Sequence, residues 1–244
     1  MTQRHNPTEA LEAITAAAKK GDGWRHLWLG TSGFGKTYAN NLFIKWVLRT
    51  RRAALVLSLD DKNNFRAQYD GGTYRINPDD LRARQPTGSE PANHIVFRGV
   101  ALTRKFNHGC SASDVARLGQ DIVGVSQGLV VVNIDELADA TNGGQAWTRE
   151  DGAESPITQV YRKGRGVGLS ISATTQLPQS LPREAFALSD TIAIFRLTGR
   201  EIAYLLKAKA ITDELAAVIP TLQIGDFILY DKNQVEWNGK IYRF

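Results

Sequence analysis

The chain has 244 residues, of which 42% are hydrophobic and 23% charged, which is the composition of an ordinary globular protein with a substantial core. No apolar run approaches the roughly 20 residues that span a bilayer, and no secretory signal is visible, so we expect no transmembrane segment. The single cysteine, Cys110, excludes an internal disulfide and fits a reducing compartment. A net charge of +5 fits a polyanionic partner, but it fits a merely basic enzyme equally well.

Residues 1–22 are predicted to form an N-terminal helix ahead of one main domain, which would cover residues 23–244. Asn6 is a suitable cap, Pro7 suits the first helical position, and Gly21 can end the helix. The apolar face of this helix is thin. It is therefore either an arm, which could pack on a neighbouring subunit, or a helix on the surface of its own domain.

A glycine-rich loop follows the apolar, β-like run 25–29. Residues 30–37 fit the pattern G-x-x-x-x-G-K-[ST] at every fixed position. The residues after the loop predict a helix, because apolar side chains recur with a 3.6-residue period at Ala39, Leu42, Phe43, Trp46 and Val47. This context of strand, loop and helix favours a phosphate-binding loop over a chance glycine-rich turn.

The residue types of the loop suit phosphate chemistry. Glycines let successive backbone N–H groups turn inward around phosphate oxygens, and the start of the next helix favours an anion. Lys36 would reach the β- and γ-phosphates of a nucleotide, and the Thr37 hydroxyl would ligate Mg²⁺. The residues expected to bind the nucleotide are Gly30, Thr31, Ser32, Gly33, Phe34, Gly35, Lys36, Thr37 and Tyr38.

The middle of the chain contains two further predicted strands. The continuous apolar run 53–59 is typical of a strand buried on both faces, and it ends in two acidic residues where open α/β sheets bind ligands. Residues 63–93 are less regular, and 94–98 is predicted as the other strand. A loop at 101–112 carries Arg104 and Lys105. Its His108 and Cys110 are two potential ligands, too few for a zinc site.

A helix from 113 to about 125 leads to a second apolar strand, 129–134, which is followed by Asp135 and Glu136. A buried strand that ends in two acids is the Walker B arrangement. In it, Asp135 would hold the magnesium shell and Glu136 would polarise the attacking water. The alternative is a strand that ends in an acidic helix cap, and the phosphate loop upstream disfavours it.

The last hundred residues alternate strands with helices. A long glycine-bearing loop is predicted at 138–156, and loops of this length are usually functional or disordered. The predicted elements after it are a helix at 157–163, strands at 169–175 and 191–197, a helix at 199–209 and a β-meander from 227 to 244.

Four motifs together resemble those of one superfamily. They are the phosphate loop, the strand that ends in Asp135 and Glu136, the segment R-G-V-G-L-S-I-S-A-T-T-Q-L-P at 165–178, and L-Q-I-G-D-F-I at 222–228. The third has an arginine and a glutamine eleven residues apart and discriminates best, whereas many families share the phosphate loop. The chain resembles the FtsK/HerA superfamily of P-loop motor ATPases, ring translocases that move double-stranded DNA, over about residues 25–230.

The resemblance implies roles for two more residues. Gln176 is similar to the polar sensor of the γ-phosphate at the end of the strand beside Walker B, although it could simply cap that strand. Arg165 is similar to the arginine finger that reaches a neighbouring subunit's nucleotide, although it could be a surface arginine. Arg162 and Lys163 are close enough to compete for the second role. The expected catalytic residues are therefore Glu136, Lys36, Gln176 and Arg165, with Thr37 and Asp135 as magnesium ligands.

The resemblance also implies a fold and a function. The fold would be α/β of the RecA-like P-loop NTPase type, with a mostly parallel sheet, helices on both faces and an antiparallel C-terminal edge. The function would be ATP- and Mg²⁺-dependent translocation of double-stranded DNA by a homo-oligomeric ring, expected to be a hexamer. The absence of accessory domains favours a viral genome-packaging ATPase, in the host cytoplasm or associated with the virion, docked on a capsid vertex, portal or membrane protein.

Three other functions stay open. They are a cellular or conjugative DNA translocase, a nucleotide-switched DNA-binding or assembly protein, and a small-molecule kinase that shares only the phosphate loop. The kinase is disfavoured because Glu136 supplies a water-activating acid. The loops 138–156, with Trp147 and Arg149, and 101–112, with Arg104 and Lys105, are the candidates for DNA contact.

Overall fold

The computed structural model describes residues 4–16, 22–50, 55–60, 93–98, 112–123, 129–140, 155–231 and 239–244. These residues form a nine-stranded sheet in the order β1-β9-β8-β7-β2-β6-β5-β3-β4. The six strands from β7 to β4 are parallel, β8 is antiparallel to β7 and β9, and β1 is parallel to β9. The strands are β1 (Arg4–His5), β2 (Arg25–Leu29), β3 (Leu55–Asp60), β4 (Asn93–Arg98), β5 (Val130–Ile134), β6 (Leu169–Thr175), β7 (Thr191–Ile194), β8 (Asp226–Asp231) and β9 (Ile241–Arg243).

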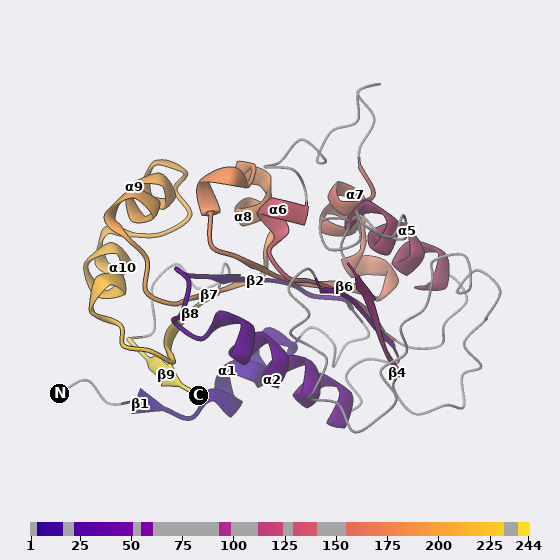
Figure 1. Cartoon of the computed structure of the whole chain (residues 1–244), viewed down its shortest axis with the longest axis horizontal. Helices are drawn as coiled ribbons and strands as arrows, with labels where there is room; N and C mark the ends of the chain where they lie inside the picture. The colour runs from indigo at the N-terminus through magenta and orange to yellow at the C-terminus, as the bar shows by residue number, and fades with distance from the viewer. Residues whose placement is uncertain are drawn as a thin grey trace.

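Helices cover both faces of this sheet (Figure 1). One face carries α1 and α2, and the other carries α5 to α9. The predicted α/β fold, mostly parallel with an antiparallel C-terminal edge, is therefore confirmed. The helices are α1 (Pro7–Ile14), α2 (Lys36–Arg49), α5 (Ala112–Val123), α6 (Leu137–Ala140), α7 (Pro156–Lys163), α8 (Arg183–Leu188), α9 (Gly199–Lys207) and α10 (Asp213–Val218), with single 3₁₀ turns at Arg165–Val167, Pro178–Ser180 and Ile219–Thr221.

The central strands are buried on both faces, as their continuous apolar runs predict. In β5, Val130, Val132 and Ile134 join the core under α5 and α7, whereas Val131 joins the core under α2. Side chains alternate between the faces of a strand, so both cores need an apolar residue at nearly every position. Asn133 is the exception within β5, and it is completely buried.

The buried stripe of α2 differs from the predicted one. Leu42 and Trp46 are only partly buried, whereas Asn40 and Ile44 are buried instead. The helix rests on the sheet along Asn40, Phe43, Ile44 and Val47, a stripe with offsets of 3, 4 and 7 residues that is rotated from the predicted one. The prediction missed it because the polar Asn40 does not count in an apolar period.

The N-terminal segment also differs in part from the predicted helix. Residues 4–5 form a strand beside β9, and α1 begins at Pro7, where the Asn6 side chain accepts a hydrogen bond from the Thr8 N–H. This helix packs on the sheet of its own chain, through buried side chains that share a core with Trp24 and Trp28: Ala10, Leu11 and Ile14.

The strand at the sheet edge is held by a buried carboxylate. Asp226, at the start of β8, accepts hydrogen bonds from Arg4 of β1 at 3.0 Å and from Arg243 of β9 at 2.6 Å. Burial raises the pKa of the Asp226 carboxyl, but the bonds from Arg243 and Arg4 outweigh burial and leave this pKa below its usual value. The carboxylate therefore joins the first and last strands of the described chain.

Several predicted features lie partly or wholly outside the described residues. These are the acid at 61, the irregular stretch 63–92, most of the loop at 101–112 with its cysteine, and residues 141–154 of the long loop. Part of that long loop is helical, because α6 occupies Leu137–Ala140 and α7 begins at Pro156. In the part of the chain that the structure describes, no helix has the length and apolar character needed to cross a membrane.

Candidate nucleotide-binding site

The glycine-rich loop joins β2 to α2 at the centre of the sheet, because β2 lies between β6 and β7. Hydrogen bonds hold it to both neighbours. The Gly30 N–H donates to the Thr175 carbonyl at 3.4 Å, and the Thr31 N–H and hydroxyl donate to the Arg196 carbonyl at 3.0 and 3.1 Å. The loop is therefore held between the ends of β6 and β7, at the carboxyl ends of the parallel strands, which is where α/β sheets bind ligands.

Two fixed glycines of the loop pattern are required by this geometry. A Cβ on Gly30 would lie 2.6 Å from the Cβ of Phe195, which is far inside van der Waals contact. Gly35 has φ of +101°, a left-handed conformation that residues with a side chain rarely adopt. A chance glycine-rich turn would need neither constraint.

Lys36 is the first residue of α2 and is buried inside the loop. Its Nζ donates to the Thr31 carbonyl at 3.0 Å, so the ammonium lies within the curve of the backbone. Gly35 precedes α2 and supplies no side-chain cap. The first N–H groups of the helix and the Lys36 charge therefore face the same loop, which is the arrangement that attracts phosphate.

The two acids follow β5, and β6 separates this strand from the phosphate loop. The Thr174 hydroxyl donates to Asp135 Oδ1 at 2.7 Å and accepts from the Glu136 N–H at 2.9 Å. The Thr175 hydroxyl and the Gln176 N–H donate to Glu136 Oε1 at 2.9 and 2.8 Å. The end of β6 therefore positions both carboxylates and brings Gln176 to them.

Glu136 has an unusual backbone. Its φ of +52° lies in the left-handed region, which costs a residue with a side chain about 1–3 kcal/mol. Its side chain is 3% exposed, although a carboxylate is rarely buried without specific partners. Strain of this kind gathers at functional sites, and here the bond from the Glu136 N–H to Thr174 and the bonds from Thr175 and Gln176 to the carboxylate sustain it.

Thr174 and Thr175 support the acids, a role that the sequence motifs did not predict. The signal was present, because they immediately precede Gln176 in the A-T-T-Q segment at the end of a predicted strand. The contacts on the other side of the phosphate loop were not predicted either. The Gly225 N–H donates to the Phe34 carbonyl at 3.2 Å, and the Arg196 guanidinium lies 5.4 Å from the centre of the Phe34 ring.

The residues at this edge fit a nucleotide with Mg²⁺. Thr37 lies in the first turn of α2, Asp135 follows β5, and hydroxyl and carboxylate oxygens are ligands that Mg²⁺ prefers. Among the described residues there is no group of three His, Cys, Asp or Glu side chains that could hold a metal alone.

Arg165 is not part of this cluster within one chain. It precedes β6, whereas Gln176 follows it, so the seven residues of the strand place the two about 23 Å apart. Arg165 is 45% exposed and forms ion pairs with Asp190 at 3.4 Å and Asp22 at 3.9 Å. Asp190 is also held by Arg25. Arg165 therefore lies at the amino ends of the parallel strands, whereas the phosphate loop lies at their carboxyl ends.

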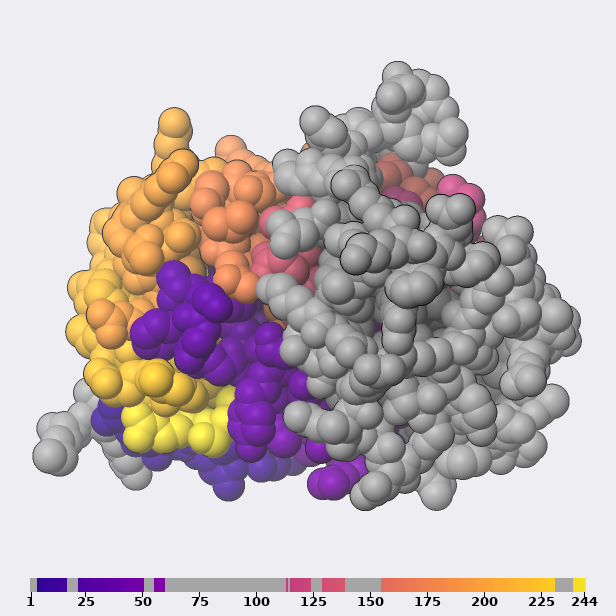
Figure 2. Space-filling model, viewed as in Figure 1, coloured from indigo at the N-terminus to yellow at the C-terminus, as the bar shows by residue number. Residues whose placement is uncertain are grey.

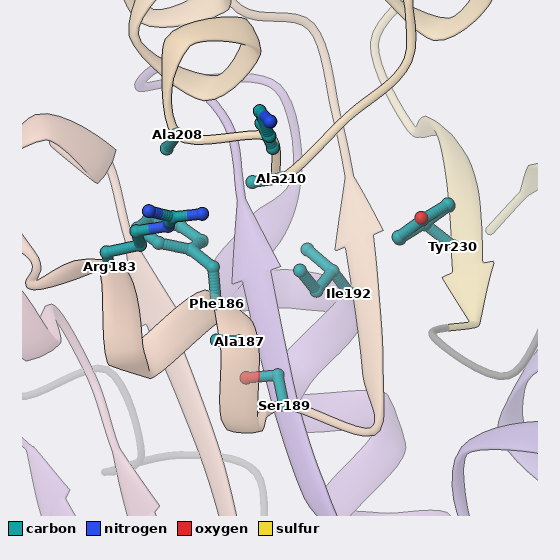
Figure 3. A pocket seen from close by; sticks show the side chains of 9 residues that line it. Arg183, Phe186, Ala187, Ser189, Ile192, Ala208, Ala210 and Tyr230 are labelled. Atoms are coloured by element: carbon teal, nitrogen blue, oxygen red, sulfur yellow. The ribbon is translucent and has the colours of Figure 1, made fainter. Parts of the chain in front are cut away.

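A cavity of about 240 Å³ lies apart from the phosphate loop (Figure 3). Its apolar lining includes Phe186 and Ile192, which belong to the core on the face opposite to α2. Arg183 and Lys209 give it two basic groups. None of the loop residues 30–37 lines it, so this cavity is not the nucleotide site that the motifs indicate.

No protein-family model matches the chain, and no curated protein matches it by sequence. Solved structures do match. The genome-packaging NTPase B204 of Sulfolobus turreted icosahedral virus 2, in complex with AMPPCP, is 17% identical with a TM-score of 0.64, covering 91% of this chain and 97% of that one. VirB4 of Thermoanaerobacter pseudethanolicus is 10% identical with a TM-score of 0.57, covering 86% of this chain and 87% of that one.

The conjugation coupling protein TcpA of pCW3, with ATPγS, is 13% identical with a TM-score of 0.51, covering 92% of this chain and 60% of that one. At these identities the likeness establishes the fold. The chain therefore has the fold of these solved structures, and the P-loop NTPase fold predicted from the sequence is confirmed.

Proposed function

We propose that this chain is an ATPase that drives double-stranded DNA through a homo-oligomeric ring, and that its task is to package a viral genome into a preformed capsid. The observation that carries the ATPase is the pair of buried acids, Asp135 and Glu136, bound to the end of the strand beside the phosphate loop. The packaging task is supported by the likeness to B204 over nearly the whole of both chains.

The residues of one chain would divide the work of hydrolysis. The loop amides and Lys36 bind the β- and γ-phosphates. Thr37 and Asp135 would hold Mg²⁺, which when bound neutralises charge on the phosphate oxygens. Glu136 accepts a proton from the attacking water, and its bonds to Thr175 and the Gln176 N–H keep the carboxylate in place. The Gln176 side chain contacts the γ-phosphate.

Arg165 would complete the nucleotide site of a neighbouring subunit. Its place at the opposite edge of the sheet supports this assignment, because within its own chain it is about 23 Å from Gln176. A head-to-tail contact between subunits would bring the Arg165 end of one sheet to the phosphate-loop end of the next, and such contacts generate a ring when the rotation closes. A guanidinium delivered in this way makes hydrolysis depend on assembly. We infer a hexamer, with a capsid vertex, portal or membrane protein as its docking partner.

ATP hydrolysis with and without double-stranded DNA tests the proposal. We expect stimulation by DNA and near-complete loss of activity in Lys36→Ala and Glu136→Gln. Displacement of a third strand from a DNA triplex measures translocation itself. Hydrolysis without triplex displacement would contradict the motor and would favour a nucleotide-switched DNA-binding or assembly protein. Phosphoryl transfer to a small acceptor, independent of DNA, would contradict both.

Mixing variants tests the role of Arg165 in trans. Arg165→Ala and Lys36→Ala subunits are each expected to be inactive, and mixed rings should regain part of the activity. Arg162→Ala is the matched control, because Arg162 is also exposed and pairs with Glu184 at 3.0 Å. If no mixing ratio restores hydrolysis, Arg165 acts elsewhere.

A conjugative or cellular DNA translocase is the second candidate, and the likeness to VirB4 and TcpA favours it. Packaging requires binding to a capsid component, whereas conjugation requires binding to a membrane-associated channel. Co-purification of the chain with a capsid protein encoded beside it would distinguish the two.

A further inference from the structure

A chain of buried polar side chains crosses the sheet beneath α2. Ser58 of β3, Asn133 of β5 and Ser172 of β6 are register partners in adjacent parallel strands, so they stand in one row. Asn40 of α2 lies over this row, and Trp28 of β2 reaches it through a hydrogen bond to Ser172. All five side chains are completely buried, on a face whose other contacts are mainly apolar.

Four hydrogen bonds, each 3.1 Å long, connect these side chains without interruption. Trp28 Nε1 donates to the Ser172 hydroxyl, which donates to Asn40 Oδ1. Asn40 Nδ2 donates to Asn133 Oδ1, and Asn133 Nδ2 donates to the Ser58 hydroxyl. The network thus links α2 to the four strands β2, β6, β5 and β3, which are adjacent in the sheet.

The members of the network lie one step behind the nucleotide site. Asn40 follows Lys36 by four residues, so both lie on the same face of α2. Asn133 precedes Asp135 by two residues and therefore points to the same side of β5. Ser172 precedes Thr174, which donates to Asp135, by two residues as well.

Stability alone does not explain these residues. Buried amides and hydroxyls gain little over apolar side chains of similar shape even when all their bonds are made, but they specify one relative arrangement of their neighbours. Apolar side chains, by contrast, tolerate sliding of a helix along a sheet. The arrangement specified here is that of α2, which carries Thr37, relative to β5, which Asp135 directly follows.

We propose that Asn40 and Asn133 are positioning residues that set the distance between the two magnesium-binding groups, the Thr37 hydroxyl and the Asp135 carboxylate. This inference rests on the proposed ATPase function. Both amides are completely buried, so neither would touch a bound nucleotide directly. Their bond at 3.1 Å fixes the helix that begins with Lys36 against the strand that the two acids follow.

Asn40→Leu tests the proposal, with Asn41→Leu as the matched control. Asn41 is the next residue of α2 and is 3% exposed, and its Oδ1 has no hydrogen-bond partner among the described residues. We expect Asn40→Leu to raise the Mg²⁺ concentration for half-maximal hydrolysis about tenfold and to lower kcat about 10–100-fold. Binding of a fluorescent ATP analogue in EDTA should change by less than about threefold. Asn41→Leu should leave all three quantities near the wild-type values.

The double variant Asn40→Leu/Asn133→Leu separates positioning from stability. Replacing both partners of a buried hydrogen bond by apolar groups can restore the free energy of unfolding that one replacement removes. We expect the double variant to regain melting temperature over Asn40→Leu, while its Mg²⁺ requirement stays high. Recovery of both quantities together would overturn the proposal, as would wild-type Mg²⁺ dependence in a folded Asn40→Leu chain.

Failure of the proposed function gives a different result from failure of this inference. If the wild-type chain binds ATP but does not hydrolyse it, the tightening of AMPPNP binding by Mg²⁺ replaces the kinetic readout. Asn40→Leu should then lose that tightening and Asn41→Leu should keep it, and equal tightening in both would overturn the inference. If the wild-type chain binds no nucleotide, the proposed function and this inference both fall.

Discussion

A single hydroxyl group, that of Thr174, holds both acids of the site, and the variant Thr174→Val removes it without changing the shape of the side chain. The hydroxyl donates to Asp135 Oδ1 at 2.7 Å and accepts from the Glu136 N–H at 2.9 Å. Valine offers neither bond. Because Thr174 is 1% exposed, water does not easily replace them.

The expected magnitude follows from these two bonds. A hydrogen bond to a charged carboxylate contributes about 1.5–3 kcal/mol, and a buried N–H left without an acceptor costs about 1–3 kcal/mol. Part of this is recovered, because the left-handed backbone of Glu136 is then free to relax. We therefore expect Thr174→Val to lower the free energy of unfolding by about 3 kcal/mol and to lower kcat at least tenfold.

Urea unfolding with an unchanged m-value measures the first quantity, and ATP hydrolysis at saturating Mg²⁺ measures the second. Thr174→Ser is the control, because it keeps the hydroxyl and loses one buried methyl group, at a cost of about 1 kcal/mol. If valine and serine at this position give the same stability and the same kcat, the hydroxyl does not support the acids.

Three further predictions concern other parts of the molecule. Burial lowers the pKa of His26 to about 3, so below pH 6.5 the unfolded chain binds a proton that the folded chain does not. The wild-type chain should therefore lose about 2 kcal/mol of its free energy of unfolding between pH 7 and pH 5, as measured by urea titration. His26→Gln should not show this loss. Asp226→Asn should lower the free energy of unfolding by about 1–3 kcal/mol, with Asp121→Asn, at an exposed position of α5, as the control. Because the Asp226 pKa lies below its usual 3.8, the wild-type contribution should be complete above that pH and vanish as the pH falls through the lowered pKa. Identical stability profiles at acid pH for Asp226→Asn and Asp121→Asn would contradict this. Arg196→Ala should weaken ATP binding about fivefold by removing a cation beside Phe34 of the phosphate loop, and Arg196→Lys should keep most of the affinity. Equal Kd values for ATP in calorimetry for wild type and Arg196→Ala would exclude a contribution of the Arg196 charge to ATP binding.

Much of the fold could be predicted because its signals are local. The apolar runs of β3, β5 and β6 read directly as buried strands, and the Asn6 cap marks the start of α1. The two-residue strand β1 could not be predicted, because it exists only through its pairing with β9, more than two hundred residues away in the chain.

In the candidate site too, local features could be predicted from the sequence and long-range contacts could not. The phosphate loop and the acid pair are contiguous motifs, so the sequence could indicate them. The bond of Asn40 to Asn133 and that of Thr174 to Asp135 join residues 93 and 39 positions apart, and no periodicity reveals such pairs. An asparagine on the buried face of a helix also hides the true stripe of α2, because it counts as polar in any apolar period.

The order of the strands has a consequence for synthesis of the chain. The loop-bearing strand β2 is made early, but both of its neighbours in the sheet, β6 and β7, come from residues 169–194. These segments, far apart in the sequence, meet in space: Figure 2 shows the purple segment around α2 lying against the orange and yellow C-terminal part. After the phosphate loop has been translated, well over a hundred further residues must therefore be added before both strands that flank the loop exist. We therefore expect nascent chains to bind no ATP until β7 has emerged from the ribosome, so an incomplete chain should not hydrolyse ATP.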